Sequence, residues 1–101
     1  MKRRFSLTRK AKSDLIEIAR HTQEQWGLEQ RNLYLRMLDE CFRQLAASPQ
    51  QGSDCSEIRA GYRKLLAGRH IIFYRLPAGD SVEIVRILHG RMDFEAHLSK
   101  T

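Results

Sequence analysis

Two long segments in the first half of the chain repeat their apolar residues at helical spacing. Between residues 9 and 26, apolar side chains recur every three or four positions, with charged residues between them. A second stripe of the same spacing runs from 28 to about 47 and ends before Pro49, because the residue preceding a proline is disfavoured in the α region. Since Gly27 alone separates the two predicted helices, we expect them to form an antiparallel hairpin.

The second half of the chain has the composition of β-strands. Segments 62–67, 70–76 and 81–88 are rich in β-branched and aromatic residues, and short connections with turn chemistry join them. This pattern predicts three antiparallel strands in a meander. The β-permissive segment Arg3–Leu7 precedes the first helix and is expected to form an edge strand. Residues 50–58 match neither period and are expected to form a loop.

The order of these segments predicts the class of the fold. A short helical turn expected at 93–97 completes the series. We therefore expect an α+β fold with an N-terminal edge strand, an antiparallel helix hairpin packed on a small antiparallel sheet, and a short C-terminal helix. A chain of 101 residues is too short for two stable cores, so residues 1–101 are expected to form one domain.

The last two predicted strands are apolar on both faces. Strict alternation predicts these opposing sets: Val82, Ile84 and Leu88 against Val85 and Ile87 in the last strand, and Ile71 and Phe73 against Ile72, Tyr74 and Leu76 in the strand before it. One helical layer covers only one of these faces. Either the chain's own 55–59 loop and tail or a second protein must cover the other, and the sequence leaves both alternatives open.

The chain carries a net charge of +6, and the charge is unevenly distributed. Residues 1–12 hold six bases and no acid, 13–58 hold four bases and eight acids, and 59–91 hold seven bases and two acids. Basic segments of this kind are compatible with binding to nucleic acid, with binding to an acidic protein partner, or with a role in solubility alone. The basic start is expected to be a solvated face.

No apolar run resembles a membrane span or a signal peptide, so we expect a cytoplasmic protein.

Cysteine and histidine do not form recognisable sites. Cys41 and Cys55 are too few for a disulfide framework, and the four histidines lack the spacing of metal ligands. We therefore expect no disulfide, no metal site and no cofactor. His70 is expected to be an edge residue with its hydrogen bonds satisfied, and Trp26 to anchor the core at the turn between the helices.

Arginine and tyrosine near the strand ends are the candidates for binding a partner. Gly61 is flanked by Arg59, Tyr62 and Arg63. The guanidinium groups of the two arginines have the geometry to bind a phosphate or a carboxylate of a partner. In the structural alternative, Tyr62 packs under the helices and the arginines pair with nearby acids. His89 and Asp93 have the spacing of a hydrogen bond that fixes the tail; in the alternative, they belong to a surface that contacts the target.

An ordered set of residues along nearly the whole chain resembles the ParE branch of the RelE/ParE superfamily of bacterial type II toxins. The set comprises Leu7, Ala11 and Asp14-Leu15; Trp26-Gly27, Gln30 and Tyr34; Pro49 and Gly52; Arg59 and Gly61-Tyr62-Arg63; His70 and Phe73-Tyr74-Arg75; Arg86-Ile87-Leu88-His89; Met92-Asp93; and His97-Leu98. Each landmark alone is weak, but the ordered series is specific.

The resemblance implies a toxin that inhibits DNA gyrase, arrests growth and stabilises plasmids until a ParD-like antitoxin neutralises it. It implies no catalytic residue, and it implies contact with operator DNA only through the antitoxin. On this interpretation the expected target-binding residues are Arg59, Tyr62, Arg63, Arg86, His89, Arg91, Met92 and Asp93. The residues expected to bind the antitoxin are Phe73, Arg75, Ile84 and Val85.

Two other functions within the superfamily are alternatives. RelE-like toxins cut mRNA on the ribosome, and candidates for that chemistry are Tyr62, Arg63, Arg86, His89 and Arg91. RelE-like enzymes tend to carry a tyrosine near the C-terminus, whereas this chain has none after Tyr74. The second alternative is a non-toxic corepressor that binds DNA together with its antitoxin.

Overall fold

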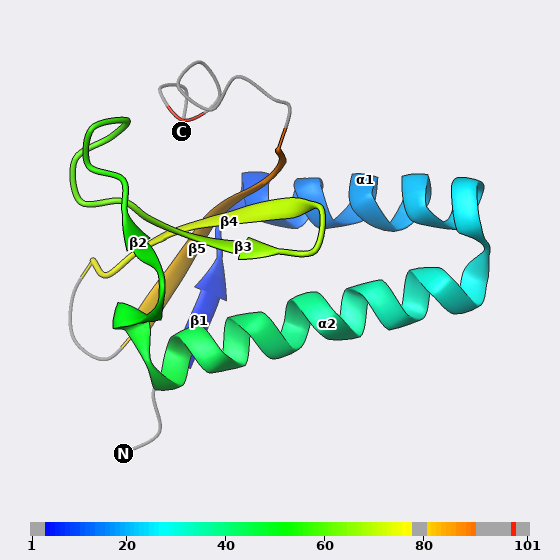
Figure 1. The fold of residues 1–101 in the computed structure, drawn as a ribbon, viewed down its shortest axis with the longest axis horizontal. Helices are drawn as coiled ribbons and strands as arrows, with labels where there is room; N and C mark the ends of the chain where they lie inside the picture. The colour runs from blue at the N-terminus through cyan, green and yellow to red at the C-terminus, as the bar shows by residue number, and fades with distance from the viewer. Residues whose placement is uncertain (1–3, 78–80, 91–97, 99–101) are drawn as a thin grey trace.

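The computed structural model describes residues 4–77, 81–90 and 98. Within these ranges, two helices pack on one face of a five-stranded mixed sheet, which confirms the α+β class (Figure 1). In chain order the elements are β1 (Arg4–Leu7), α1 (Arg9–Trp26), α2 (Leu28–Ala47), the 3₁₀ turn η1 (Pro49–Gln51), β2 (Ser53–Asp54), β3 (Arg63–Ala67), β4 (His70–Arg75) and β5 (Ser81–His89). The helical turn expected at 93–97 lies outside the described ranges.

The two helices form the predicted antiparallel hairpin. The Thr8 hydroxyl accepts the N–H of Ala11 at 3.1 Å and so caps the first turn of α1. Gly27 links the helices with a φ of 92°, a value that glycine adopts without steric cost. The turn of the hairpin projects beyond the end of the sheet (Figure 1). Side chains near that turn therefore lack a sheet to pack against.

The sheet has the strand order β1-β5-β4-β3-β2. Strands β3, β4 and β5 form the predicted antiparallel meander, and β1 lies at an edge as predicted. The expectation of a wholly antiparallel sheet is wrong, because β1 pairs with β5 in the parallel direction. The apolar pattern of a four-residue strand specifies which side chains are buried but not the direction of its neighbour.

The segment expected to be a loop at 50–58 contains regular structure. Ser53 and Asp54 pair with β3, and the Tyr74 hydroxyl holds the preceding turn by donating to the Pro49 carbonyl at 2.7 Å and accepting the Gly52 N–H at 3.0 Å. A Cβ atom on Gly52 would collide with that hydroxyl and with the carbonyl of Lys64. This short strand therefore depends on contacts with distant residues, which a local pattern does not reveal.

An irregularity in β5 changes the faces that strict alternation predicts. Phe73 pairs with Arg86 and Tyr74 pairs with Ile84, so Val85 is an extra residue, as in a β-bulge. Beyond this point the alternation reverses. Ile87 therefore lies under the helices and Leu88 on the opposite face, and the predicted positions of these two side chains were wrong.

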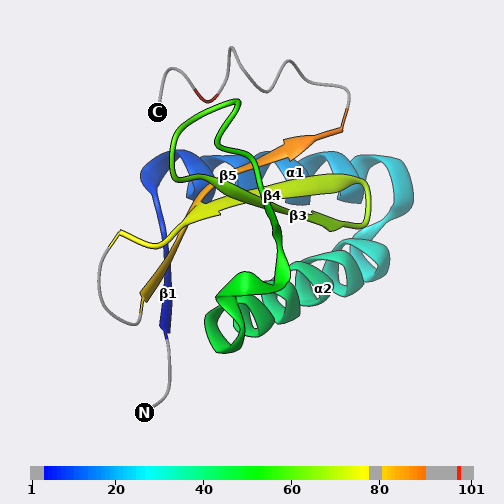
Figure 2. The same ribbon diagram turned by 60° about the vertical axis from the view of Figure 1, so that its left-hand side comes forward.

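Both faces of the sheet carry a buried core. The helix-side core consists of Ala11, Ile18, Leu38, Phe42, Leu45, Ala67, Ile72, Tyr74, Val82, Ile84 and Ile87. The second core, on the opposite face, consists of Cys55, Tyr62, Phe73, Val85, Leu88 and Leu98, with Ile58 and Ile71 packed against it. The loop between β2 and β3 folds over this second face (Figure 2). The chain's own residues therefore cover the second face.

Arg59 helps to hold the second core closed. Its guanidinium donates to the carbonyl of Leu98 at 3.2 Å and lies 5.6 Å from the centre of the Tyr62 ring. The side chain of Leu98 is completely buried. A residue expected to bind the target thus joins the loop after β2 to the C-terminal part of the chain.

The first turns of α1 protect the edge of β5 that β1 leaves unpaired. Strand β1, Arg4–Leu7, pairs with Ser81–Ile84 of β5. Further along, the Thr8 hydroxyl donates to the Val85 carbonyl at 2.8 Å, and the Asp14 carboxylate accepts the N–H of Ile87 at 2.9 Å. The same carboxylate accepts two N–H groups of Arg86 at 2.8 and 2.9 Å. Asp14 therefore accepts hydrogen bonds both from a backbone N–H at the edge of β5 and from the charged side chain of Arg86.

Replacing Asp14 tests this contact. The Asp14 and Arg86 side chains are only 14% and 13% exposed, so Asp14→Ala leaves a largely buried guanidinium without its carboxylate. We expect the free energy of unfolding to fall by about 3 kcal/mol in urea denaturation. The control, Glu24→Ala, breaks an exposed ion pair with Arg20 and should change stability far less. Equal losses in the two variants would contradict the assigned role of Asp14.

Candidate interaction surfaces

The structure does not bring the predicted target-binding arginines together. Arg63 donates to the carbonyls of Gly52 and Gln50, whereas Arg86 is held by Asp14. Tyr62 is buried in the second core, on the face opposite the helices and not beneath them. These side chains support different parts of the fold and do not form one patch.

Among the remaining predicted target residues, only His89 is described. It ends β5, and its ring meets the His70 ring edge to face, with centroids 5.6 Å apart. Arg91, Met92 and Asp93 lie outside the described ranges, so the expected contact between His89 and Asp93 does too.

Three of the four predicted antitoxin-binding residues are enclosed by this chain. Phe73 and Val85 belong to the second core, and Ile84 belongs to the helix-side core. Arg75 is exposed, and it forms an ion pair with Glu83 of the neighbouring strand. A protein that docks on the folded chain meets Arg75 but not the other three.

A shallow groove on the helix side offers a different apolar surface. We call this the apolar groove; it has a volume of about 350 Å³ and is lined by Phe5, Leu7, Leu15, Ile16, Ala19, Leu35, Asp39 and Phe42. These residues come from β1, α1 and α2. Ile16 is 67% exposed, and it is adjacent to the apolar stripe that faces the core. The sequence signal was the pair Leu15-Ile16, which makes the stripe wider than a buried face requires.

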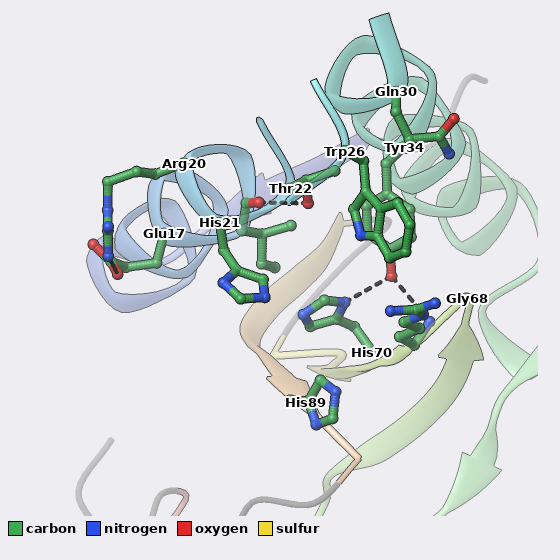
Figure 3. A pocket seen from close by; sticks show the side chains of 12 residues that line it. Glu17, Arg20, His21, Thr22, Trp26, Gln30, Tyr34, Gly68, His70 and His89 are labelled. Atoms are coloured by element: carbon green, nitrogen blue, oxygen red, sulfur yellow. Dashed lines mark hydrogen bonds and ion pairs between the residues drawn. The ribbon is translucent and has the colours of Figure 1, made fainter. Parts of the chain in front are cut away.

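A second and larger groove lies beside the turn of the helix hairpin (Figure 3). We call this the Trp26 groove; it has a volume of about 740 Å³ and is lined by Glu17, Ile18, Arg20, His21, Thr22, Trp26, Gln30, Tyr34, Gly68, Arg69, His70 and His89. Its walls are the end of α1, the start of α2, the β3–β4 turn and the end of β5. Three histidines from separate parts of the sequence thus meet in one groove.

Trp26 is not the core anchor that the sequence predicted. Its side chain is 59% exposed, because the end of α1 extends past the sheet. The guanidinium of Arg69 lies over the indole, 5.4 Å from the ring centre. The apolar stripe correctly placed Trp26 on the inward-facing side of the helix, but the stripe carries no information about where the sheet stops.

Tyr34 and His70 fix the inner wall of the Trp26 groove. The Tyr34 hydroxyl accepts the N–H of Arg69 at 3.0 Å and lies 2.7 Å from Nδ1 of His70. The same hydroxyl lies 3.4 Å from the carbonyl oxygen of Ala67, so Tyr34 joins three consecutive parts of the β3–β4 connection. Burial, reinforced by the proximity of His89, lowers the pKa of His70 to about 4. His70 has hydrogen bonds as predicted, but it opens an inner strand and not an edge.

A metal-ligand cluster or a reactive cysteine would point to chemistry among the described residues. Within the part of the chain that the structure describes, no group of three or more His, Cys, Asp or Glu side chains is placed to hold a metal ion. Cys41 and Cys55 are free thiols, and burial raises the pKa of each. Over the same described ranges, no helix is both long enough and apolar enough to cross a membrane.

Solved structures contain the same fold. A chain described as "Chromosomal ParDE TA system from P. aeruginosa" superimposes with a TM-score of 0.74 at 25% sequence identity. The match covers 88% of this chain and 96% of that one. The small α+β architecture is thus shared with a component of a toxin–antitoxin system.

Sequence comparisons identify the family. A family model described as "ParE toxin of type II toxin-antitoxin system, parDE" matches residues 5–94. Toxin ParE1 of Mycobacterium tuberculosis is 43% identical over 98 residues, which are 97% of this chain and 100% of the relative. Toxin ParE1 of Caulobacter vibrioides is 40% identical over 93% of this chain and 96% of its own length. The chain belongs to the ParE toxin family of type II toxin–antitoxin systems.

Proposed function

We propose that this ParE-family toxin inhibits DNA gyrase by binding, without catalysing a reaction, and that a ParD-like antitoxin neutralises it. The observation that carries the proposal is the match over nearly the full length to proteins named as ParE toxins. Because gyrase and its DNA are cytoplasmic, the proposal places the protein in the cytoplasm. Contact with operator DNA is made through the antitoxin.

The placement of the polar side chains supports binding over RNA cleavage. A ribonuclease needs an acid, a base and cations gathered around one phosphate. Here Tyr62 is buried in the second core, Arg86 is engaged by Asp14, and Arg63 holds the turn before β2. These three candidates for RelE-like chemistry are part of the scaffold.

Gyrase activity provides the direct test of the proposed function. Purified toxin is added to gyrase and plasmid DNA, and supercoiling and DNA cleavage are followed on agarose gels. We expect toxin to inhibit supercoiling or to accumulate cleaved plasmid in a dose-dependent manner, because a bound toxin interferes with the DNA passage cycle. Adding the antitoxin should abolish the effect.

Two results would overturn this assignment. If the toxin has no effect on gyrase at any ratio but cleaves mRNA on translating ribosomes, as detected by primer extension, the function is RelE-like. If expression leaves a sensitive host growing normally and the complex still binds its operator, the corepressor alternative is correct.

We further propose that the antitoxin docks in the apolar groove. The groove exposes apolar side chains from three elements, and an amphipathic segment that binds there would cover them. Lys12 lies one helical turn before Ile16 and is exposed, so that face of α1 is suited to an acidic partner. The solved ParDE system shows that a chain of this fold is found in a ParDE toxin–antitoxin system.

A charge at Ile16 tests the docking surface. Because Ile16 is 67% exposed, Ile16→Asp should leave the fold intact while placing a carboxylate in an apolar interface. We expect the affinity for the antitoxin to fall by about tenfold or more in calorimetry. Leu66→Asp is the matched control, since Leu66 is 72% exposed on β3 and lies outside the groove.

The two variants must both retain the thermal unfolding profile of a folded protein. Unchanged affinity in Ile16→Asp, or equal losses in both variants, would exclude the apolar groove as the docking site. Aspartate at Ile84 or Val85 is not a useful test, because these residues are buried and the variants would unfold.

A further inference from the structure

We propose that the Trp26 groove binds a nucleotide, with a heteroaromatic base stacked on the Trp26–Arg69 pair and a phosphate near Arg69. The nucleotide comes either from an unpaired DNA strand or from the free pool, since the chemistry recognised is the same. This site is separate from the apolar groove, and its binding is measurable without gyrase or antitoxin. The inference therefore stands or falls independently of the proposed function.

The groove is rich in aromatic rings. Trp26, Tyr34 and the three histidines His21, His70 and His89 contribute five of its twelve lining residues. Trp26 remains 59% exposed although an indole is among the side chains that gain most from burial. Proteins that bind single-stranded nucleic acid use such exposed aromatic faces, and arginine planes, to stack bases.

Arg69 supplies a cation placed beside the stacking surface. Within residues 4–77, 81–90 and 98 it forms no ion pair with a carboxylate, whereas Arg20 pairs with both Glu17 and Glu24. The Arg69 guanidinium is therefore available to a phosphate, for which its fork of donors is well suited. Because Arg69 also stacks on Trp26, its side chain contributes to recognition of both the base and the phosphate.

The wall that carries Arg69 is fixed before any ligand binds. Gly68 has a φ of 61°, and a Cβ atom there would press against the Tyr34 hydroxyl. That hydroxyl also accepts the N–H of Arg69 and is hydrogen-bonded to His70. Because the turn is already ordered, binding costs little conformational entropy. The His70 ring lies in the same wall and meets the Tyr34 ring edge to face, so it adds aromatic surface to the groove.

The size and charge of the groove favour a nucleotide over an acidic peptide. Its volume of about 740 Å³ falls in the range of small-ligand clefts, roughly 300–1,000 Å³. An acidic peptide needs several unpaired cations, and Arg69 is the lining arginine without a carboxylate partner in the described chain. Five aromatic rings beside one available guanidinium match a base with its phosphate more closely.

Intrinsic fluorescence reports binding directly, because Trp26 is the only tryptophan in the chain. Purified toxin is titrated at physiological salt with a thymidine oligonucleotide, thymidine monophosphate, the corresponding duplex, inorganic phosphate and a glutamate-rich peptide. We expect saturable quenching by the oligonucleotide and not by phosphate. Equal quenching by the mononucleotide assigns the ligand to the free pool, and quenching by the oligonucleotide alone assigns it to a DNA strand.

Variants distinguish binding in the Trp26 groove from nonspecific attraction to the positive charge of the protein. Arg69→Ala and Trp26→Leu should each weaken binding of a fluorescently labelled oligonucleotide by about tenfold or more, measured by anisotropy. Arg36→Ala removes an exposed arginine of α2 outside the groove and should change the affinity less than twofold. Circular dichroism confirms that each variant is folded.

Several outcomes would overturn the proposal. They are the absence of saturable quenching by either nucleotide ligand, equal binding of duplex and single strand, equal quenching by phosphate, and stronger binding of the acidic peptide. Equal losses in Arg69→Ala and Arg36→Ala would show that attraction is nonspecific and would likewise exclude the site.

Discussion

The fold depends on covering both faces of a sheet whose inner strands are apolar on each side. The helix hairpin covers one face, and the loop after β2 covers the other together with Leu98. Burial of apolar surface is the main favourable term in folding, so neither cover is dispensable. Covering the second face with the chain's own residues also encloses Phe73 and Val85, which a partner would otherwise contact. Apolar side chains that remain exposed lie elsewhere, among them Ile16 on α1 and Leu66 on β3.

Much of this architecture was predictable from periodicity, and the exceptions have physical causes. Both helices and the meander followed from the spacing of apolar residues, because that spacing decides which side chains are buried. The extra residue Val85 was not predictable, since a bulge preserves the apolar composition of β5 while reversing its alternation. The exposure of Trp26 was missed because the length of the sheet relative to the helices is a property of the assembled fold.

The candidate site was less predictable than the fold. Arginine and tyrosine were singled out because their chemistry suits phosphate and carboxylate, but the same chemistry stabilises a small protein internally. Arg86 binds Asp14, 72 positions earlier in the sequence, and Arg59 reaches Leu98, 39 positions later. Such partners are determined by the tertiary structure. The two grooves likewise combine residues from elements that are distant in the sequence, so no local sequence motif predicts them.

The central claim is that the antitoxin binds on the helix side of the sheet, at the apolar groove, while the second core stays closed. Amide hydrogen exchange of the toxin, alone and bound to its antitoxin, tests this most directly. The account predicts added protection in the helix segments 12–19 and 35–42, with no change in 55–62 and 84–88. Gain or loss of protection in 55–62 and 84–88, with the helices unchanged, would contradict it.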